Sequence, residues 1–93
     1  MIYTDGVKFF AEEGGEHGAY WFLDLVATEV LPMQSRHPFL FLVLTVADEK
    51  AELRVEDGNR KRLNQRPIAY TDLQSGEWTF YLIENTLLLV TEY

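Results

Sequence analysis

The chain has 93 residues, no cysteine and a formal net charge of −7, with 47% hydrophobic and 14% aromatic residues. A chain of this length and composition can bury a core, so we expect residues 1–93 to form a single domain rather than a disordered segment. The absence of cysteine excludes disulfides, thiolate metal sites and cysteine nucleophiles. No apolar run is long enough to span a bilayer and the first residues lack the pattern of a signal peptide, so we expect a cytoplasmic protein.

Two helices are predicted in the first third of the chain. Thr4 or Asp5 can cap a helix whose apolar residues recur at three- and four-residue steps until Gly14 ends it. A second helix is expected from about residue 17 to Val30. Its inward stripe at helical spacing is predicted to comprise Leu23, Val26, Ala27 and Val30.

Another stripe of the second helix carries Trp21, Asp24 and Thr28, again three and four residues apart. A tryptophan on such a stripe is either covered by the first helix or exposed for a partner. Large aromatic side chains are usually mostly buried, yet they are also enriched in interface hot spots. Both interpretations stay open.

The rest of the chain predicts a sheet. Five runs of residues have strand character, at 39–47, 51–57, 60–65, 78–83 and 86–91. The first is almost unbroken apolar, which is typical of a central strand, and Arg66-Pro67 marks an edge or a break after the third. The predicted fold class is therefore α+β, with two N-terminal helices packed on a four- to five-stranded antiparallel meander sheet.

Acidic and basic residues are segregated along the chain. Residues 1–35 have a net charge of −5, residues 36–66 of +2 and residues 67–93 of −4. Two acidic segments that share a face attract basic proteins and repel nucleic acid and anionic membranes. We therefore expect a basic protein partner, with no direct binding of nucleic acid or membrane.

One feature is typical of nucleic-acid binding, a group of cations comprising Arg54, Arg60, Lys61, Arg62 and Arg66. Cations at a hairpin can follow a phosphate backbone and lose affinity as the salt concentration rises. Three flanking acids, Glu52, Glu56 and Asp57, oppose that interpretation. A charged edge strand also guards against edge-to-edge pairing. An edge guard, an interaction patch and a nucleic-acid site all stay open.

No constellation of residues indicates a reaction, and we expect neither an enzyme nor a cofactor. Glu13, Glu16 and His17 do not supply the four converging ligands that zinc usually requires. The glycine-rich turn before the second helix could present amides to a phosphate, but it has no lysine and its glutamates would repel the anion. Neither Ser35 nor Ser75 lies in a nucleophile elbow. Paired carboxylates of the glycosidase kind stay open, because 15 acids in so small a chain make accidental pairs certain.

Short aromatic and glycine signatures span most of the chain. They are Tyr3-Thr4-Asp5-Gly6-Val7, Ala11-Glu12, Gly18-Ala19-Tyr20-Trp21-Phe22-Leu23-Asp24, and the ending from Leu87-Leu88-Leu89 to Glu92-Tyr93. They resemble a family of small uncharacterised proteins found in bacteria, phages and mobile elements. That family has no established activity, so the resemblance implies no catalytic residues. In size, acidity and lack of cysteine the chain is also similar to the anti-CRISPR class, whose members block a nucleic-acid-binding complex, often by offering carboxylates where phosphates would bind.

The favoured hypothesis is an acidic, non-enzymatic protein-binding module, an anti-CRISPR-like or DNA-mimic inhibitor that blocks the nucleic-acid-binding surface of a bacterial protein complex. The predicted partner-binding residues are Glu12, Glu13, Glu16, Trp21, Asp24 and Glu29. Their carboxylates would oppose cations on the partner, and the tryptophan would pack against it.

Two other hypotheses remain. One is a structural or assembly subunit of a phage or mobile element, in which an edge strand forms a homodimer and the acidity serves solubility. The other is a small hydrolase or ligand-binding protein that uses the turn from Gly14 to Gly18. The sequence predicts no oligomeric state.

Overall fold

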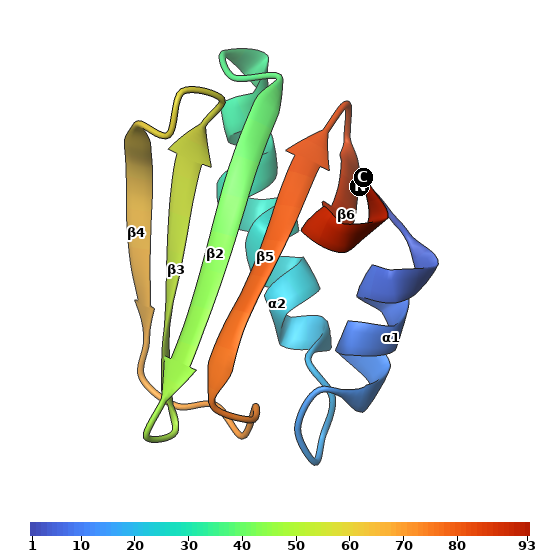
Figure 1. Cartoon of the computed structure of the whole chain (residues 1–93), viewed down its shortest axis with the longest axis vertical. Helices are drawn as coiled ribbons and strands as arrows, with labels where there is room; N and C mark the ends of the chain where they lie inside the picture. The colour runs from blue at the N-terminus through green and yellow to red at the C-terminus, as the bar shows by residue number, and fades with distance from the viewer.

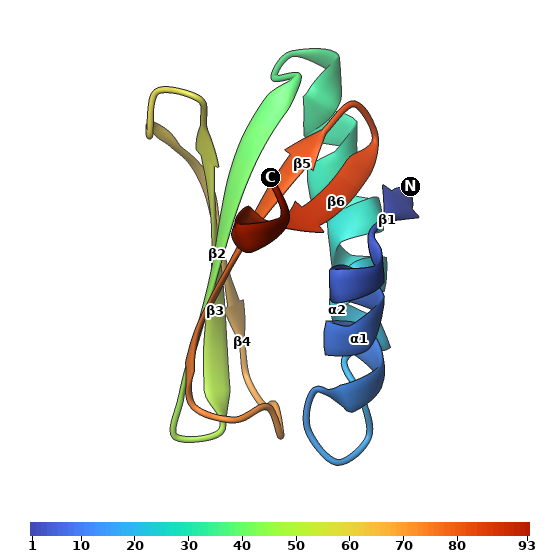
Figure 2. The ribbon, with the colours of Figure 1, turned by 45° about the vertical axis from the view of Figure 1, so that its right-hand side comes forward.

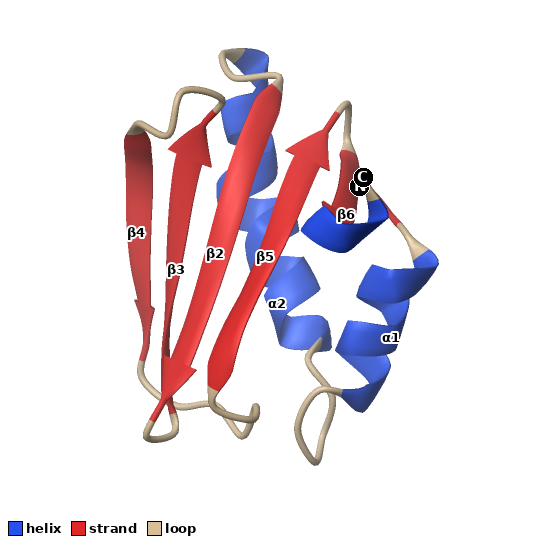
Figure 3. Cartoon of the chain, viewed as in Figure 1, coloured by secondary structure: helices blue, strands red, loops and turns tan.

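The computed structural model describes all 93 residues and has two layers, with α1 and α2 on one face of a six-stranded sheet (Figures 1 and 2). The strands are β1 (Ile2–Tyr3), β2 (Phe39–Ala47), β3 (Lys50–Asp57), β4 (Arg62–Ile68), β5 (Gly76–Ile83) and β6 (Thr86–Leu89). The helical segments are α1 (Asp5–Glu13), α2 (Tyr20–Leu25), the π-helical turn η1 (Val26–Val30) and the 3-10 turns η2 (Leu31–Ser35) and η3 (Val90–Glu92) (Figure 3). The predicted α+β class is confirmed.

The sheet is mixed, in the order β1-β6-β5-β2-β3-β4, and the predicted antiparallel meander is only partly present. β2, β3 and β4 do form a meander, but β5 returns to the other side of β2 and pairs with it antiparallel. β1 adds a sixth strand, parallel to β6. The apolar run of β2 accounts for the return, because a strand this hydrophobic is favoured in the centre of a sheet, with a neighbour on each side.

Some boundaries, and the burial of one residue, differ from those predicted. The second helix continues past Val30 through η1 and η2, and Pro32 is accommodated in the first turn of η2, where a missing N–H does little harm. Ala27 is exposed, although the rest of the predicted inward stripe is buried. β4 continues through Pro67, which therefore lies in an edge strand and does not break it.

The core lies between the helices and the inner face of the sheet. Its centre is formed by Phe10 of α1, Phe22 of α2 and Phe80 of β5, whose ring centroids are 5.7, 5.4 and 4.9 Å apart in pairs. Alternate leucines of β2 face these rings and are fully buried. The same alternation gives β2 a second, outer face that neither α1 nor α2 covers (Figure 2). No helix in the structure combines the length and the apolar character needed to cross a membrane.

Residues close to the two ends of the chain are in contact at the start of α1. Thr4 caps α1, as predicted, by accepting a hydrogen bond from the backbone N–H of Val7 at 3.4 Å. Glu92 in turn accepts hydrogen bonds from the Thr4 hydroxyl at 2.6 Å, the Gly6 N–H at 3.1 Å and the Leu89 N–H at 2.9 Å. These bonds, the Thr4 hydroxyl first, lower the pKa of Glu92. A residue from the end of the chain therefore completes the cap of the first helix.

Candidate protein-binding site

The turn between α1 and α2 is held by Asp72, from the connection between β4 and β5. Asp72 Oδ2 accepts hydrogen bonds from the backbone N–H groups of Glu16 at 3.0 Å and His17 at 3.3 Å. Gly15 has a φ of 70°, and a Cβ there would collide with the Asp72 carboxylate, so the position requires glycine. The two amides that a phosphate would need are therefore already bound to a carboxylate.

The residues considered as zinc ligands do not form a metal centre. Glu13, Glu16 and His17 are all exposed to solvent. Nowhere in the chain do three His, Cys, Asp or Glu side chains converge as ligands would.

Three turns at one end of the molecule bring together acidic side chains from distant parts of the sequence, at the lower end of Figure 1. The turn after α1 meets the β4–β5 connection through Asp72, and that connection meets the β2–β3 turn through a hydrogen bond from Thr71 N–H to the Glu49 carbonyl at 2.8 Å. We call this surface the acidic end. Its carboxylates belong to Glu12, Glu13, Glu16, Asp48, Glu49, Asp72 and Glu77. The turns that form it contain no lysine or arginine, and Lys50, the first residue of β3, borders them.

Three of the predicted partner-binding residues, Glu12, Glu13 and Glu16, lie at the acidic end and are exposed. Lys8 approaches Glu12 at 3.8 Å, and the Tyr20 hydroxyl donates to the same carboxylate at 3.4 Å. Removal from water, followed by the charge of Glu12, raises the pKa of Tyr20. Glu13 and Glu16 have no basic side chain within 4.0 Å, so their charges are uncompensated.

Trp21 is half-buried, between the two predicted alternatives of covered and exposed. Its ring packs edge-on against Phe22, with centroids 6.0 Å apart and planes at 84°. It also borders two hollows. One, of about 370 Å³, lies between the second helix and β4, and the other, of about 240 Å³, is lined by His17, Tyr70 and Asp72. The indole is therefore accessible from two sides of the helix.

The remaining predicted residues, Asp24 and Glu29, line the larger hollow. Glu29 accepts hydrogen bonds from Arg66 Nε at 3.1 and 3.2 Å, so its charge is compensated. Asp24 is exposed and has no basic side chain within 4.0 Å. The structure thus divides the predicted carboxylates into three without a basic partner, Glu13, Glu16 and Asp24, and two in ion pairs, Glu12 and Glu29. The partner-binding role of the six residues stays a prediction.

Sequence reasoning did not select Tyr70 and Asp72. Tyr70 is 69% exposed and borders the smaller hollow beside Trp21, which places a second aromatic ring at the acidic end. A signal was present, because Tyr-Thr-Asp at 70–72 repeats Tyr-Thr-Asp at 3–5, and the threonine hydroxyl accepts a backbone N–H in both. The repeated tripeptide indicates a turn, but it does not indicate that this turn would contact the turn between α1 and α2.

A protein-family model described as "Family of unknown function (DUF6876)" matches residues 1–93. A search of curated proteins and a search of solved structures find no match.

Proposed function

Since the chain belongs to this family of unknown function, we propose a role from its own surface: a non-enzymatic module that binds a basic surface of another protein through the acidic end. One observation carries the proposal. Uncompensated carboxylates from separate segments of the chain gather beside two accessible aromatic rings, Trp21 and Tyr70.

The two kinds of side chain would contribute differently. An exposed ion pair is worth only about 0 to 1 kcal/mol, so the carboxylates mainly steer a cationic partner and set its orientation. A desolvated aromatic anchor can contribute about 2 kcal/mol or more. We therefore assign most of the affinity to Trp21 and Tyr70, and most of the selectivity for a basic partner to the carboxylates.

We further propose that the partner is a bacterial nucleic-acid-binding complex. The acidic end would take the place of the phosphates, as in a DNA-mimic or anti-CRISPR-like inhibitor. Duplex DNA carries about one charge per 1.7 Å, hence about 15 charges over the 25 Å width of this molecule. The acidic end offers seven carboxylates, roughly half as many. Competition with DNA should therefore be effective at low salt and weaken as salt is raised.

The alternative, an assembly subunit that dimerises through an edge strand, has β4 as its available edge. Two features of that edge oppose strand addition. Pro67 has no N–H to donate, and the pairing of β4 with β3 shifts register between Val55 and Glu56. We therefore rank it second.

A pair of charge-matched triple variants tests the proposal. Glu13→Gln, Glu16→Gln and Asp24→Asn remove the three predicted carboxylates that have no basic side chain within 4.0 Å, two at the acidic end and one in the hollow that Trp21 borders. Asp5→Asn, Glu52→Gln and Glu84→Gln remove three charges elsewhere, so both proteins have a net charge of −4. In affinity capture from a bacterial lysate at low salt, the first variant should lose basic partners about tenfold and the second should retain them.

Each further outcome has a defined meaning. Equal loss in both variants would show that total charge alone governs capture, and the assigned surface would be wrong. Tyr70→Ala, a change at an exposed side chain, should also weaken capture. If labelled DNA does not displace the captured partner, the DNA-mimic role would be wrong, but the role as a protein-binding module would stand.

A further inference from the structure

A cluster of aromatic side chains lies on the outer face of the sheet, which α1 and α2 leave uncovered (Figure 2). The rings of Phe39 and Phe41 on β2 lie 5.0 and 5.7 Å from that of Tyr81 on β5. Tyr93, which follows η3, packs edge-on against Tyr81 at 5.2 Å and is 80% exposed. We call these four residues the aromatic platform. Phe39, Phe41 and Tyr81 are half-buried, so their exposed parts and the ring of Tyr93 form the surface that a ligand could contact.

Cations lie beside the platform, in the turn between β3 and β4. The guanidinium carbon of Arg60 is 4.9 Å from the centroid of the Phe41 ring. The ion pairs of the structure use Lys8, Arg54 and Arg66. Three consecutive cations of the turn therefore have no carboxylate within 4.0 Å: Arg60, Lys61 and Arg62.

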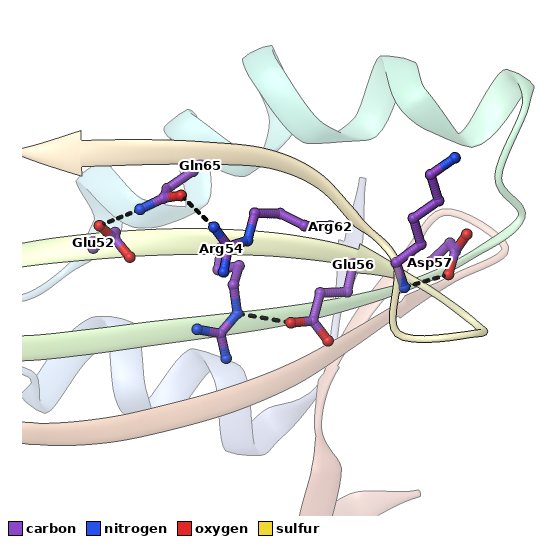
Figure 4. Close-up of polar contacts among 7 residues, drawn as sticks. Glu52, Arg54, Glu56, Asp57, Arg62 and Gln65 are labelled. Carbon is purple, nitrogen blue, oxygen red and sulfur yellow. Dashed lines mark hydrogen bonds and ion pairs between the residues drawn. The ribbon is translucent and has the colours of Figure 1, made fainter.

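The acids that flank these cations are held by other groups (Figure 4). Glu56, which is 9% exposed, pairs with Arg54 at 2.7 Å. Asp57 accepts two backbone N–H groups of its own turn, and these bonds lower the pKa of Asp57. Glu52 accepts a side-chain amide of β4 at 2.6 Å. None of these acids forms an ion pair with Arg60, Lys61 or Arg62 within 4.0 Å. The charge of Lys61 nevertheless helps to lower the pKa of Asp57, and Gln65 links Glu52 to Arg62, so the acids offset part of the charge of the cluster.

We propose that this face binds single-stranded nucleic acid, with bases on the aromatic platform and phosphates at Arg60, Lys61 and Arg62. Aromatic rings within a cationic surface are the chemistry of sequence-tolerant single-strand binding. A duplex keeps its bases stacked inside and cannot offer them to the rings. An acidic peptide would pair with the cations but would offer no base to stack on the exposed rings.

The net charge of the chain does not prevent this binding. The β3–β4 turn and the acidic end lie at opposite ends of the sheet (Figure 1), in a molecule whose long axis measures 34 Å. The Debye length at physiological salt is about 8 Å, so the distant carboxylates are largely screened. The expectation of no direct nucleic-acid binding rested on the net charge of the whole chain. A nucleic acid on the platform would mainly experience the charges close to it.

Fluorescence anisotropy with labelled oligonucleotides tests the inference, using a twelve-nucleotide oligothymidine, an oligouridine of the same length and a twelve-base-pair DNA duplex. Tyr93→Ala removes a ring of the platform that is 80% exposed, and Tyr70→Ala removes a ring at the acidic end that is 69% exposed, as its control. Lys61→Gln removes a cation of the turn, and Lys50→Gln is its control.

We expect both single strands to bind more tightly than the duplex. The affinities of the oligothymidine and the oligouridine show whether deoxyribose or ribose is preferred. Tyr93→Ala should weaken this binding by about fivefold or more, which corresponds to at least one stacked base. Lys61→Gln should reduce the slope of log affinity against log salt by about 0.7. Both control variants should bind as the wild type does.

Four results would overturn the inference. They are no binding of either single strand at low salt, tighter binding of the duplex, equal effects of Tyr93→Ala and Tyr70→Ala, and a dimer in sedimentation that Tyr93→Ala dissociates. The last would assign the platform to a second copy of the chain. The acidic end supplies only the two control variants, so failure of this inference would leave the proposed function untouched, and the reverse also holds.

Discussion

Replacing Glu92 with glutamine should destabilise the protein by about 1 kcal/mol. The Gly6 N–H lies in the first turn of α1, where backbone donors have no partner within the helix, and the Glu92 carboxylate accepts it. Glutamine keeps one oxygen for the Thr4 and Leu89 donors but loses the second acceptor and the negative charge at the positive end of the helix. Such a cap contributes about 1 kcal/mol at an exposed site, and the charge about 0.3 to 1 kcal/mol.

The pH dependence of this loss identifies its cause. The pKa of Glu92 is lowered in the folded protein, so the contribution of the carboxylate is complete above about pH 4.3, where an unfolded glutamate titrates. It is lost as the pH falls through the lower, folded pKa. Urea unfolding of the wild type and of Glu92→Gln should therefore show a gap of about 1 kcal/mol at pH 7 that shrinks progressively toward pH 3. A gap of constant size over that range would refute the reasoning.

A substitution at Gly6 provides the control. A Cβ at Gly6 would lie 2.6 Å from the carboxyl carbon of Glu92, so alanine there displaces the carboxylate from the cap. Alanine favours a helix over glycine by up to about 1 kcal/mol, which offsets that loss in the wild type. In a Glu92→Ala background nothing is displaced, and Gly6→Ala should stabilise the protein. Equal effects of Gly6→Ala in both backgrounds would show that the two residues are not coupled.

Three further changes have clear expectations. Phe22→Ala should cost about 3 to 5 kcal/mol in urea unfolding, because the ring is fully buried, whereas Phe9→Ala, at a side chain that is 67% exposed, should change stability by less than about 0.5 kcal/mol. Arg54→Met should lower the free energy of unfolding by about 2 kcal/mol, since it leaves the buried carboxylate of Glu56 without its donor, and Glu56→Gln in the same chain should recover part of the loss. Asp72→Ala should speed hydrogen exchange of the two amides that Asp72 binds in the turn after α1, and leave exchange in the core unchanged.

The elements that the sequence predicts well are those with local causes. The Thr4 cap and the spacing of apolar residues mark α1, and the unbroken apolar run identifies β2 as the central strand. The grouping of Trp21, Asp24 and Thr28 along one hollow follows from helical spacing alone.

The remaining features depend on pairs of residues that are far apart in the sequence. β1 has two residues and hence no periodicity, and its pairing with β6 joins the two ends of the chain. Asp72 and His17, which hydrogen-bond in the turn after α1, are 55 residues apart in the sequence, and the ion-paired Arg66 and Glu29 are 37 residues apart. Neither contact leaves a pattern in either segment. For that reason the charge of Glu29 is predicted as free and found compensated.

The charge segregation of the sequence becomes a different segregation in the folded molecule. Acids of the first and last thirds of the chain meet at the acidic end because the β4–β5 connection passes the lower end of the sheet in Figure 1 and Asp72 binds the turn after α1. Three cations of the middle third without a carboxylate partner, Arg60, Lys61 and Arg62, lie at the other end of the sheet, whereas Lys50 lies at the acidic end. Both proposed interactions depend on charge, of opposite sign at the two surfaces, so raising the salt concentration should weaken both. Salt dependence alone therefore cannot assign a ligand to one end. Variants can, because changes at two screened sites this far apart should act independently. A ligand whose binding is lost both in a Glu16 variant and, separately, in a Lys61 variant must contact both ends of the protein.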